Sequence, residues 1–464
     1  MANASLFLNK GGDTMKKKLI AILAICICFW SSQALMADIV VTTVEKTITM
    51  QDHTTYRKQG TTMVQAAPFL KALGYQVTWQ QKEGTLLITP GNMVIKANSR
   101  QASVEGSNYY LETAPVVKEG RVYIPLKFFS DFLGYNVVYK DGQMNISGTE
   151  NIGKTGKYEE EISEKRITLS AAGDFTLGYY KGQSRGGRFD EVAKANGYAY
   201  FMKNVKSIFE EDDLTIVNLE GPLTTRGSAA EKEFAIRGLP EYIKILQLGD
   251  IEVVNLANNH SKDYGNVGYT DTKSVLTKNQ IGYFGSDQTY YITINDIRIA
   301  LIGESAWSND QGMKNKLKKR ITEAKAKADL IIIEFHWGIE RENIPNKVQQ
   351  DLAKYVIDQG AHLVLGSHPH VIQGIGSYKG ANIVYSMGNF CFGANKNPDD
   401  KDTFIYRETF VLTKDGIVSE GNEIIPCSIS SVSNRNNYQP KVLTGADKER
   451  VLKRIEKYSK GLKN

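Results

Sequence analysis

Residues 361–370 read AHLVLGSHPH, an apolar run that stops at Gly366 and is followed by two histidines two positions apart. The run predicts a short buried strand, and Pro369 disfavours helical backbone at His368, so the chain turns there. Two imidazoles then leave the end of a strand at positions that can face the same side. Neutral imidazole is a common ligand for zinc-like ions, so the pair indicates a metal site, with two solvated turn histidines as the alternative.

Short apolar segments recur around this stretch from residue 167 onward. Segments with helical periodicity separate several of them, a pattern typical of an α/β fold with largely buried strands. The predicted strands are 167–171, 214–219, 252–256, 297–302, 330–335, 362–365 and 382–385. The predicted helices include 198–209, 239–248, 271–279 and 347–359. In such folds ligands gather beyond the carboxyl ends of the strands, so polar residues at those ends are the first candidates for a site.

Five of the first six predicted strands end in residues that can bind a metal ion. Because these ends are expected at one rim, their oxygen and nitrogen atoms would form a ligand set large enough for two divalent ions. Glu220 is the candidate bridging ligand, since a bridging carboxylate lets two cations share a hydroxide. The alternative for each residue alone is a hydrogen-bonded polar group at a strand end. The candidate ligands are Asp174, Glu220, Asn259, His336, His368 and His370.

His260 directly follows the candidate ligand Asn259, and Asp263 comes three residues later. A carboxylate at that spacing could orient the imidazole or raise its basicity. This arrangement predicts His260 as the proton donor to a leaving group, with Asp263 as its partner. His362 stands inside a predicted strand and is expected to be a packed core residue instead.

The first 37 residues have the pattern of an export signal. Three lysines follow Met15, the expected true start, and precede an apolar segment at 19–30. Cleavage after Ala34 or Ala37 would release the protein, whereas retention of the segment would anchor it in a membrane. Either outcome places the rest of the chain outside the cytoplasm, secreted or on the extracellular face of the cell envelope.

The net charge of +6 lies mostly outside the parts expected to fold. Residues 1–37 carry four lysines against one aspartate, and residues 446–464 carry seven basic against three acidic side chains. Neither folded part has a basic face of its own, so nucleic acid is not an expected partner. Cys391 and Cys427 would remain after removal of the signal, either as one disulfide or as two separate buried thiols.

An internal repeat occupies residues 38–147. The segment FLKALGYQVTW at 69–79 is echoed by FSDFLGYNVVY at 129–139. Each copy predicts a short helix ended by glycine and then a strand, and the Pro90-Gly91 pair predicts a hairpin between the copies. This part resembles the small α+β domain named after the copper amine oxidase N-terminal domain, which implies a spacer or wall-facing stalk without a copper site. The polar segment 148–166 is expected to be a linker.

The strand-end residues belong to longer motifs that follow one another in a fixed order. The motifs are GD at 173–174, NLEGP at 218–222, NNHSKDYG at 258–265, HWGIE at 336–340, GSHPH at 366–370 and YSMGNF at 385–390. The series resembles the CapA-type poly-γ-glutamate capsule-biosynthesis proteins, which in turn resemble the calcineurin-like metallophosphoesterases. For residues 167–430 the resemblance implies a four-layer fold of two β-sheets flanked by helices. It also implies that the six candidate ligands hold metal ions and that His260 is the catalytic histidine.

Two positions depart from the metallophosphoesterase pattern. Thr176 stands where those enzymes usually carry a histidine, so one metal position would lose a nitrogen ligand. Glu220 stands where they carry an aspartate, which lengthens the bridge by one methylene. Arg185 and Arg188, near a glycine-rich loop, could bind an anionic substrate, and Glu340 could contact the ligands or the substrate.

The resemblance implies a part in making, exporting or anchoring an anionic poly-γ-glutamate capsule or a related polymer. We expect one or two divalent ions, Mn, Zn or Fe, and hydrolysis of a phosphoester or an amide. Membrane polymer-synthase or export subunits are the expected protein partners. The alternatives are a non-catalytic scaffold with a structural or vestigial metal site, and a general envelope phosphodiesterase. The basic tail 431–464 is expected to be partly helical, docked on its own domain or lying on an anionic surface.

Overall fold

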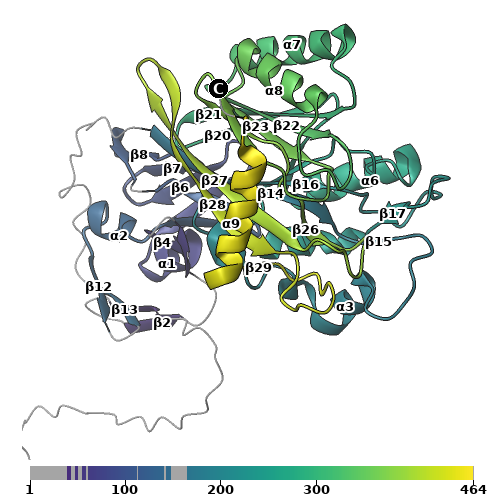
Figure 1. Cartoon of the computed structure of the whole chain (residues 1–464). Helices are drawn as coiled ribbons and strands as arrows, with labels where there is room; N and C mark the ends of the chain where they lie inside the picture. The colour runs from purple at the N-terminus through teal and green to yellow at the C-terminus, as the bar shows by residue number, and fades with distance from the viewer. Residues whose placement is uncertain are drawn as a thin grey trace, which may run out of the picture.

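The computed structural model describes residues 39–42, 47–50, 55–58, 61–111, 113–140, 143–147 and 165–462 (Figure 1). The expected signal segment 1–37 lies outside these residues, as does the stretch 148–164 of the expected linker. Lys165 and Arg166, also assigned to that linker, already belong to a long strand. Within the described residues, no helix is both long enough and apolar enough to cross a membrane.

The N-terminal region is an α+β unit of three small sheets, with strand orders β12-β13-β1-β2, β10-β11-β4-β3 and β5 to β9. Its helices are α1 (Ala66–Ala72) and α2 (Phe128–Asp131). Its first strands are β1 (Ile39–Thr42), β2 (Thr47–Met50), β3 (Thr55–Lys58), β4 (Thr61–Gln65), β5 (Gln76–Gln80), β6 (Thr85–Thr89) and β7 (Met93–Lys96). The others are β8 (Gln101–Val104), β9 (Ser107–Tyr110), β10 (Val116–Lys118), β11 (Arg121–Pro125), β12 (Asn136–Lys140) and β13 (Gln143–Ser147).

The predicted repeat and hairpin are confirmed in this region. Each copy forms a short helix followed by a strand, α1 then β5 and α2 then β12. Gly74 and Gly134 follow the two helices with φ of 92° and 73°, a conformation that glycine adopts without strain. The equivalent residues Phe69 and Phe129 meet in the core with ring centroids 5.9 Å apart. The turn at Pro90 joins β6 to β7, as predicted.

The rest of the described chain contains two larger sheets. The eight-stranded sheet has the order β19-β18-β16-β14-β27-β28-β29, with β26 also paired to β14. Its strands are β14 (Lys165–Thr176), β16 (Leu214–Leu219), β18 (Val253–Asn255), β19 (Gly282–Phe284), β26 (Asn389–Phe392), β27 (Asp402–Thr413), β28 (Gly416–Ser428) and β29 (Lys441–Val442). The six-stranded sheet has the order β20-β21-β22-β23-β25-β24. Its strands are β20 (Thr289–Ile294), β21 (Ile297–Ala306), β22 (Leu330–Trp337), β23 (Leu363–Ser367), β24 (Ile375–Tyr378) and β25 (Ala381–Val384).

The two sheets pack face to face through an apolar core. Ile216 of β16 belongs to the same buried cluster as Ile332 of β22 and Leu365 of β23. Helices cover both outer faces, as Figure 1 shows for α7 and α8 over the six-stranded sheet. These helices are α3 (Phe189–Asn196), α5 (Ile243–Leu248), α6 (Gly265–Lys278), α7 (Gln311–Lys325) and α8 (Lys347–Gln359). The predicted four-layer sandwich, preceded by a small α+β region, is therefore confirmed.

Two local predictions are wrong. Residues 198–209 do not form one helix, but a 3-10 turn η1 (Tyr198–Tyr200) and the short α4 (Lys206–Phe209). Val205, a β-branched residue with φ of −129°, lies outside the helical range and separates them. His362 is half-buried and precedes β23 instead of lying within it. Its Nδ1 accepts a hydrogen bond of 2.9 Å from the backbone of Ile331, which fixes it at the start of the strand.

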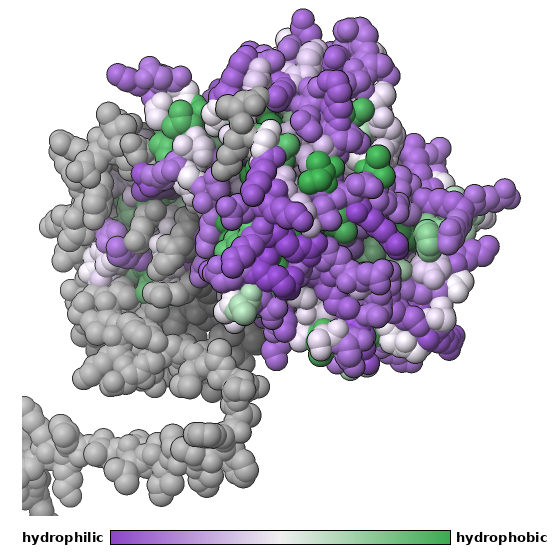
Figure 2. Space-filling model, in the orientation of Figure 1, coloured by the Kyte–Doolittle hydropathy of each residue, from purple (hydrophilic) through white to green (hydrophobic). Residues whose placement is uncertain are grey.

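The basic tail is an integrated part of the sandwich. β29 pairs with the end of β28, and α9 (Gly445–Ser459) follows it along the molecule (Figure 1). Val451 and Ile455 on α9 are buried in the core between the sheets. The prediction that this helix docks on its own domain is thus confirmed. Polar side chains dominate the outer surface in this view, with only scattered apolar residues (Figure 2).

Candidate metal centre

The predicted ligands come together, but from the strand ends of both sheets instead of from one rim. Asp174 lies in β14 and Glu220 directly follows β16, both in the eight-stranded sheet. His336 lies in β22, while His368 and His370 follow β23, in the six-stranded sheet. The parallel registers align these ends, since Asp174 pairs with Asn218 and His336 with Ser367. The face-to-face packing of the sheets then brings the two groups of side chains together.

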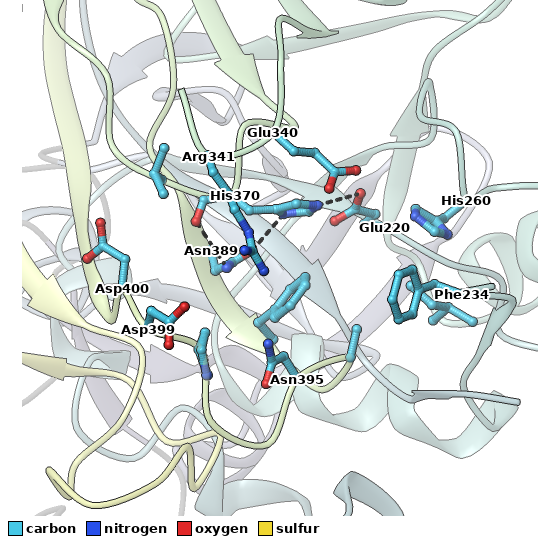
Figure 3. A pocket seen from close by; sticks show the side chains of 15 residues that line it. Glu220, Phe234, His260, Glu340, Arg341, His370, Asn389, Asn395, Asp399 and Asp400 are labelled. Atoms are coloured by element: carbon cyan, nitrogen blue, oxygen red, sulfur yellow. Dashed lines mark hydrogen bonds and ion pairs between the residues drawn. The ribbon is translucent and has the colours of Figure 1, made fainter. Parts of the chain in front are cut away.

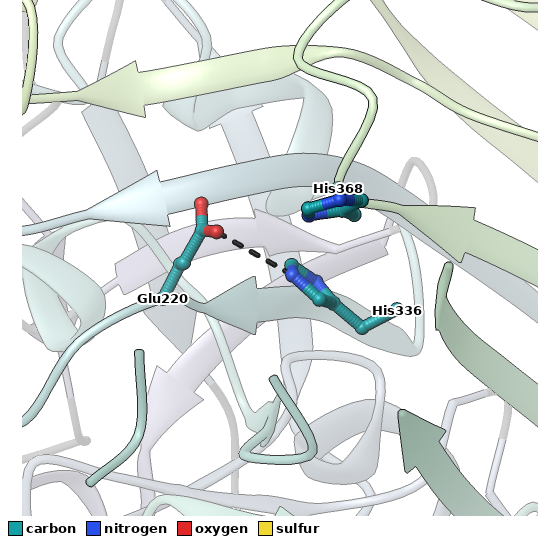
Figure 4. A group of neighbouring side chains, drawn as sticks. All are labelled: Glu220, His336 and His368. Carbon is teal, nitrogen blue, oxygen red and sulfur yellow. Dashed lines mark ion pairs between the residues drawn. The ribbon is translucent and has the colours of Figure 1, made fainter. Parts of the chain in front are cut away.

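Three overlapping sets of side chains have the spacing of a metal site. Each set offers three ligand atoms within 4.8 Å of one another. Glu220 belongs to two of the sets and faces His336 and His368 in Figure 4, which suits its predicted place between two ions. The sets are Glu220 with His336 and His368, Asp174 with Glu220 and His370, and Glu340 with His368 and His370.

Asparagine side chains hold the centre together, and sequence reasoning found only one of them. The predicted Asn259 places its Oδ1 2.7 Å from Nε2 of His336. Asn218 donates from Nδ2 to Asp174 Oδ1 at 2.8 Å, and Asn389 Oδ1 lies 2.9 Å from His370 Nδ1. Both missed residues stand inside the quoted motifs NLEGP and YSMGNF, so their position in a motif was the available signal.

The side chains present fit a divalent cation. Both carboxylate oxygens of the fully buried Glu220 lack a hydrogen-bond partner among the described residues, as does Nδ1 of His368. Burial, together with the charge of Asp174, raises the pKa of Glu220 well above its usual range. A buried carboxylate that accepts no hydrogen bond is costly unless a cation compensates it. A metal ion between Glu220 and the histidines would supply that charge.

The histidines of the centre have different proton affinities. Burial lowers the pKa of His336 far below its usual value, and burial with the neighbouring His370 lowers the pKa of His368 to about 4. Both rings are therefore neutral at pH 7 and can offer lone pairs. Burial also opposes the charged form of His370, but Glu220 and Asp174 outweigh it and raise its pKa to about 10. The proton on His370 is the positive charge that a metal ion would replace.

Beside the ligands, His260 is held by the predicted Asp263 and by an unpredicted lysine. Nδ1 of His260 lies 2.7 Å from Oδ2 of Asp263, which also accepts a bond from the backbone of Ile236. Lys232 Nζ lies 2.5 Å from the other oxygen of Asp263 and 3.2 Å from the same imidazole nitrogen. These contacts leave Nε2 as the ring nitrogen of His260 available to a substrate. No sequence pattern pointed to Lys232, which stands in a polar loop.

A pocket of about 320 Å³ opens beside these residues (Figure 3). Glu220, His260, Glu340 and His370 contribute to its wall. The predicted anion-binding residues lie elsewhere: Arg185 is exposed on a loop outside the pocket, and the half-buried Arg188 at the end of that loop does not line it either. The guanidinium of Arg188 pairs with both oxygens of Asp190, at 2.6 and 2.7 Å. Arg188 is also the residue that caps the start of α3.

Two further positions bear on the predictions. Thr176 is fully buried in β14, and its hydroxyl has no hydrogen-bond partner within the described residues. Trp307 follows β21, the strand whose end offered no candidate ligand, and is about half exposed at 51%. Its ring centroid lies 4.7 Å from that of His368 and 6.0 Å from that of His336. The fourth strand end therefore also reaches the centre, through an aromatic side chain that ligand-based reasoning does not seek.

The two cysteines and Trp337 are structural. Cys391 and Cys427 are buried free thiols, so the alternative of two separate thiols is the one observed. Trp337 is fully buried and donates its indole hydrogen to the carbonyl of Tyr385 at 2.9 Å. It packs against the helices on the outer face and not in the pocket.

Comparison with known proteins gives two matching families. Residues 168–394 match the model of a family described as bacterial capsule synthesis protein, and residues 43–147 match that of the copper amine oxidase N-terminal domain. The PGA biosynthesis protein CapA of Bacillus subtilis is 31% identical over 271 residues, which are 53% of this chain and 67% of that protein. The capsule biosynthesis protein CapA of Bacillus anthracis is 27% identical over 340 residues, 67% of this chain and 77% of that protein.

More distant similarities extend the comparison. A probable polyglutamine synthesis accessory protein of Mycobacterium tuberculosis is 24% identical over 208 residues, 38% of this chain and 55% of that protein. A solved structure of a hypothetical protein from Thermus thermophilus covers 56% of this chain and 98% of its own. Its identity is 12% and its TM-score 0.36, too low to compare the folds.

Proposed function

Because the chain belongs to the bacterial capsule synthesis protein family, we propose that it acts in making, exporting or anchoring a poly-γ-glutamate capsule. The two Bacillus relatives are named for PGA or capsule biosynthesis, and the mycobacterial relative is named for polyglutamine synthesis. The proposed place of action is the outer face of the cell envelope, reached through the signal-like segment 1–37. Membrane synthase or export subunits are the proposed protein partners.

Within that role, the proposed activity is metal-dependent hydrolysis of an amide or a phosphoester. The observation that carries it is the fully buried Glu220. Its carboxylate has no hydrogen-bond partner among the described residues and faces three histidines, with Nε2 of His336 and of His370 at 3.5 and 3.9 Å. One or two ions of Mn, Zn or Fe would be held by the sets that share Glu220. Such ions activate a water molecule at neutral pH and polarise the bond to be cleaved.

The protein's own side chains would handle the leaving group. His260 lines the pocket and can give a proton to the departing amine or alcohol from Nε2. Asp263 fixes the ring through its contact with Nδ1, and Lys232 fixes Asp263. For an amide, water would add to the carbonyl carbon, the C–N bond would break, and the proton from His260 would leave with the amine.

The first test is the metal content of the purified protein, measured by mass spectrometry beside a variant with His368→Ala and His370→Ala. About two ions per chain in the wild type, lost in the variant, would support the two-ion site. A screen of phosphoesters and γ-linked glutamyl amides would follow, with His260→Ala as the control that keeps the metal but loses turnover. A protein that binds no metal and is fully folded would contradict the hydrolase.

Thr176 favours one alternative, a non-catalytic scaffold with a single structural ion. It stands two residues after Asp174, where metallophosphoesterases usually carry a histidine, and its hydroxyl supplies no nitrogen ligand. One ion per chain with no turnover of any substrate would support the scaffold. Turnover of small chromogenic phosphoesters but not of glutamyl amides would support a general envelope phosphodiesterase.

A further inference from the structure

One arginine side chain projects into the pocket beside the metal centre. Arg341 is the one lysine or arginine among the fifteen residues that line the pocket, and its guanidinium lies between His370 and Asp399 in Figure 3. The residue stands in the loop between β22 and α8, five positions after the candidate ligand His336. It is exposed, so an entering molecule can reach it.

Arg341 differs from the other arginines near the pocket in having no anionic partner. Within the part of the chain that the structure describes, its guanidinium forms no ion pair or hydrogen bond. Arg188 is paired with Asp190, and Arg454 holds both oxygens of Asp400 at 2.9 and 2.6 Å. Because Arg454 already neutralises Asp400 at the pocket wall, the charge of Arg341 remains available to a ligand.

The backbone fixes Arg341 relative to the metal centre. Its amide donates to the carbonyl of Pro369 at 2.8 Å, and Pro369 lies between His368 and His370. Arg341 has φ of 64°, and the two histidines have φ of 96° and 59°. Non-glycine residues rarely adopt this left-handed conformation, and where they do it commonly marks a functional site. The loop that carries the arginine is thus tied to the loop that carries two candidate ligands.

The rest of the pocket wall has an apolar side and an acidic residue that limits how many anionic groups can bind. Phe234, Ile236 and Phe392 give the pocket an apolar side, and Phe234 is 45% exposed there. Asp399 is exposed at the far wall and would repel a second carboxylate on a bound chain. The pocket therefore offers one place for an anion, next to a surface for methylene groups.

We propose that Arg341 binds the free α-carboxylate of the glutamyl residue next to the scissile bond, so that a γ-linked glutamyl chain with free carboxylates binds in preference to a neutral one. Each residue of such a chain carries one α-carboxylate and two methylenes, which match the guanidinium and the apolar wall. Arginine binds carboxylates through two parallel hydrogen bonds, which lysine cannot reproduce. The proposal rests on the proposed function, since it names the substrate class of the same pocket.

Binding to the purified full chain tests the proposal without requiring turnover. The probes are γ-linked tetraglutamate and the same chain with its α-carboxylates converted to amides, titrated by calorimetry. A chelator is added in one series, so that a carboxylate cannot bind through a metal ion. The variants are Arg341→Gln, Arg341→Lys and, as a control for loss of one positive charge, Arg121→Gln, an exposed arginine of the N-terminal region.

We expect the wild type to bind the acidic chain ~10-fold more tightly than the amidated chain, as one charged hydrogen-bonded pair allows. Arg341→Gln should abolish this preference, Arg341→Lys should keep part of it, and Arg121→Gln should leave it unchanged. An unchanged preference in Arg341→Gln would overturn the proposal, as would a wild type that binds neither chain. Displacement of the acidic chain by inorganic phosphate at lower concentration would assign the pocket to phosphate instead.

The same experiment separates this proposal from the proposed hydrolase. Binding that depends on Arg341, without any hydrolysis, would support the carboxylate site and contradict the proposed hydrolase. Hydrolysis of the acidic chain at the same rate in the wild type and in Arg341→Gln would support the hydrolase and contradict the carboxylate site.

Discussion

Buried carboxylates lie at both ends of β16, but they differ in the hydrogen bonds that they accept. Asp212 and Asp213 precede the strand, and Glu220 follows it. At the first end, Asp212 accepts a bond from the hydroxyl of Thr215, and Asp213 accepts one from the backbone of Thr168, both at 2.9 Å. At the second end, the oxygens of Glu220 have no hydrogen-bond partner within the described residues. Both ends are buried, but among the described residues only the carboxylates at the first end accept hydrogen bonds. Glu220 has only histidine nitrogens at 3.5 and 3.9 Å, which marks its end as the one that suits a cation.

The compensated end also joins the N-terminal region to the sandwich. Lys118 of β10 lies 2.7 Å from Asp250, and Lys58 of β3 lies 3.9 Å from Asp213. The hydroxyl of Ser99 donates to Asp296 at 3.1 Å. Lysines from the first region therefore bring positive charge to this end of β16, Lys58 to Asp213 and Lys118 to the nearby Asp250. At the other end of the strand, we expect a metal ion to supply it.

The largest expected effect comes from substituting Glu220, whose carboxylate accepts no hydrogen bond from the described residues. We expect Glu220→Gln to lower metal affinity ~10²-fold or more, because even residues that only orient ligands contribute 10- to 100-fold. In the chelated protein the same change should raise the free energy of unfolding by about 1–3 kcal/mol, because it removes a fully buried carboxylate that accepts no hydrogen bond within the described chain. Asp213→Asn should instead lower the free energy of unfolding, because Asp213 accepts a backbone hydrogen bond and pairs with Lys58. Calorimetric melts of both chelated variants check this, and opposite signs are required for the contrast to hold.

Asp263 sharpens the contrast, since it lies beside the centre but is compensated by Lys232 and the backbone of Ile236. We expect Asp263→Asn to slow turnover ~10–100-fold through His260 while leaving metal content unchanged. Metal analysis and initial rates on one sample decide this. Asp329→Asn, which alters the exposed pair with Arg298, is the control. Loss of metal in Asp263→Asn would place that carboxylate among the ligands.

Removing an ion pair near the start of β16 should lower the free energy of unfolding and leave metal binding unchanged. Lys118→Gln leaves Asp250 without its nearest cation in a largely buried setting, and we expect a loss of about 2–3 kcal/mol. Lys347→Gln, which breaks the exposed pair with Asp351, should change stability by less than about 0.5 kcal/mol. Urea unfolding of both variants checks the difference. Equal effects would mean that the interface lysine is solvated in solution.

The last expected effect is on how the free energy of unfolding depends on pH, and it is small within any one pH unit. Burial, with the charges of Asp250 and Asp213, raises the pKa of Asp212 to about 8 from its ordinary 3.8. The folded state then keeps a proton that the unfolded chain releases, so stability falls as pH rises from about 4 to 8. Asp212→Asn should flatten this fall by up to about 1 kcal/mol per pH unit. Thermal melts at pH 5 and pH 8 measure it, and an unchanged slope would show that Asp212 is ionised in the folded protein.

Much of the fold followed from local pattern, because apolar runs and periodicity decide short buried elements. β16 and α8 have the predicted bounds, and β22 and β23 differ from prediction by only a residue or two. The stretch 198–209 was misassigned because its apolar residues suit a helix, whereas their burial in the core is achieved through a turn at Val205. Tertiary packing overrides propensity at such points.

The centre was predictable where ligands end strands and unpredictable where they come from loops. Asp174 and His336 were found because a polar residue closes an apolar run. Lys232, Trp307 and Arg341 were missed because the loops that carry them have no periodicity to align them with the centre. Arg188 was expected to bind an anion because it follows a glycine-rich loop, but its guanidinium pairs with Asp190, two residues further along the chain.

The docking of α9 has a consequence for how the protein is made. Val451 and Ile455 complete a core whose first strand begins at Lys165, so the ribosome must release nearly 300 residues before that core can close. Until then the part of that core covered by Val451 and Ile455 stays exposed, and apolar surfaces of that kind drive aggregation and recruit chaperones. A nascent chain cut before Gly445 would keep that exposed state permanently.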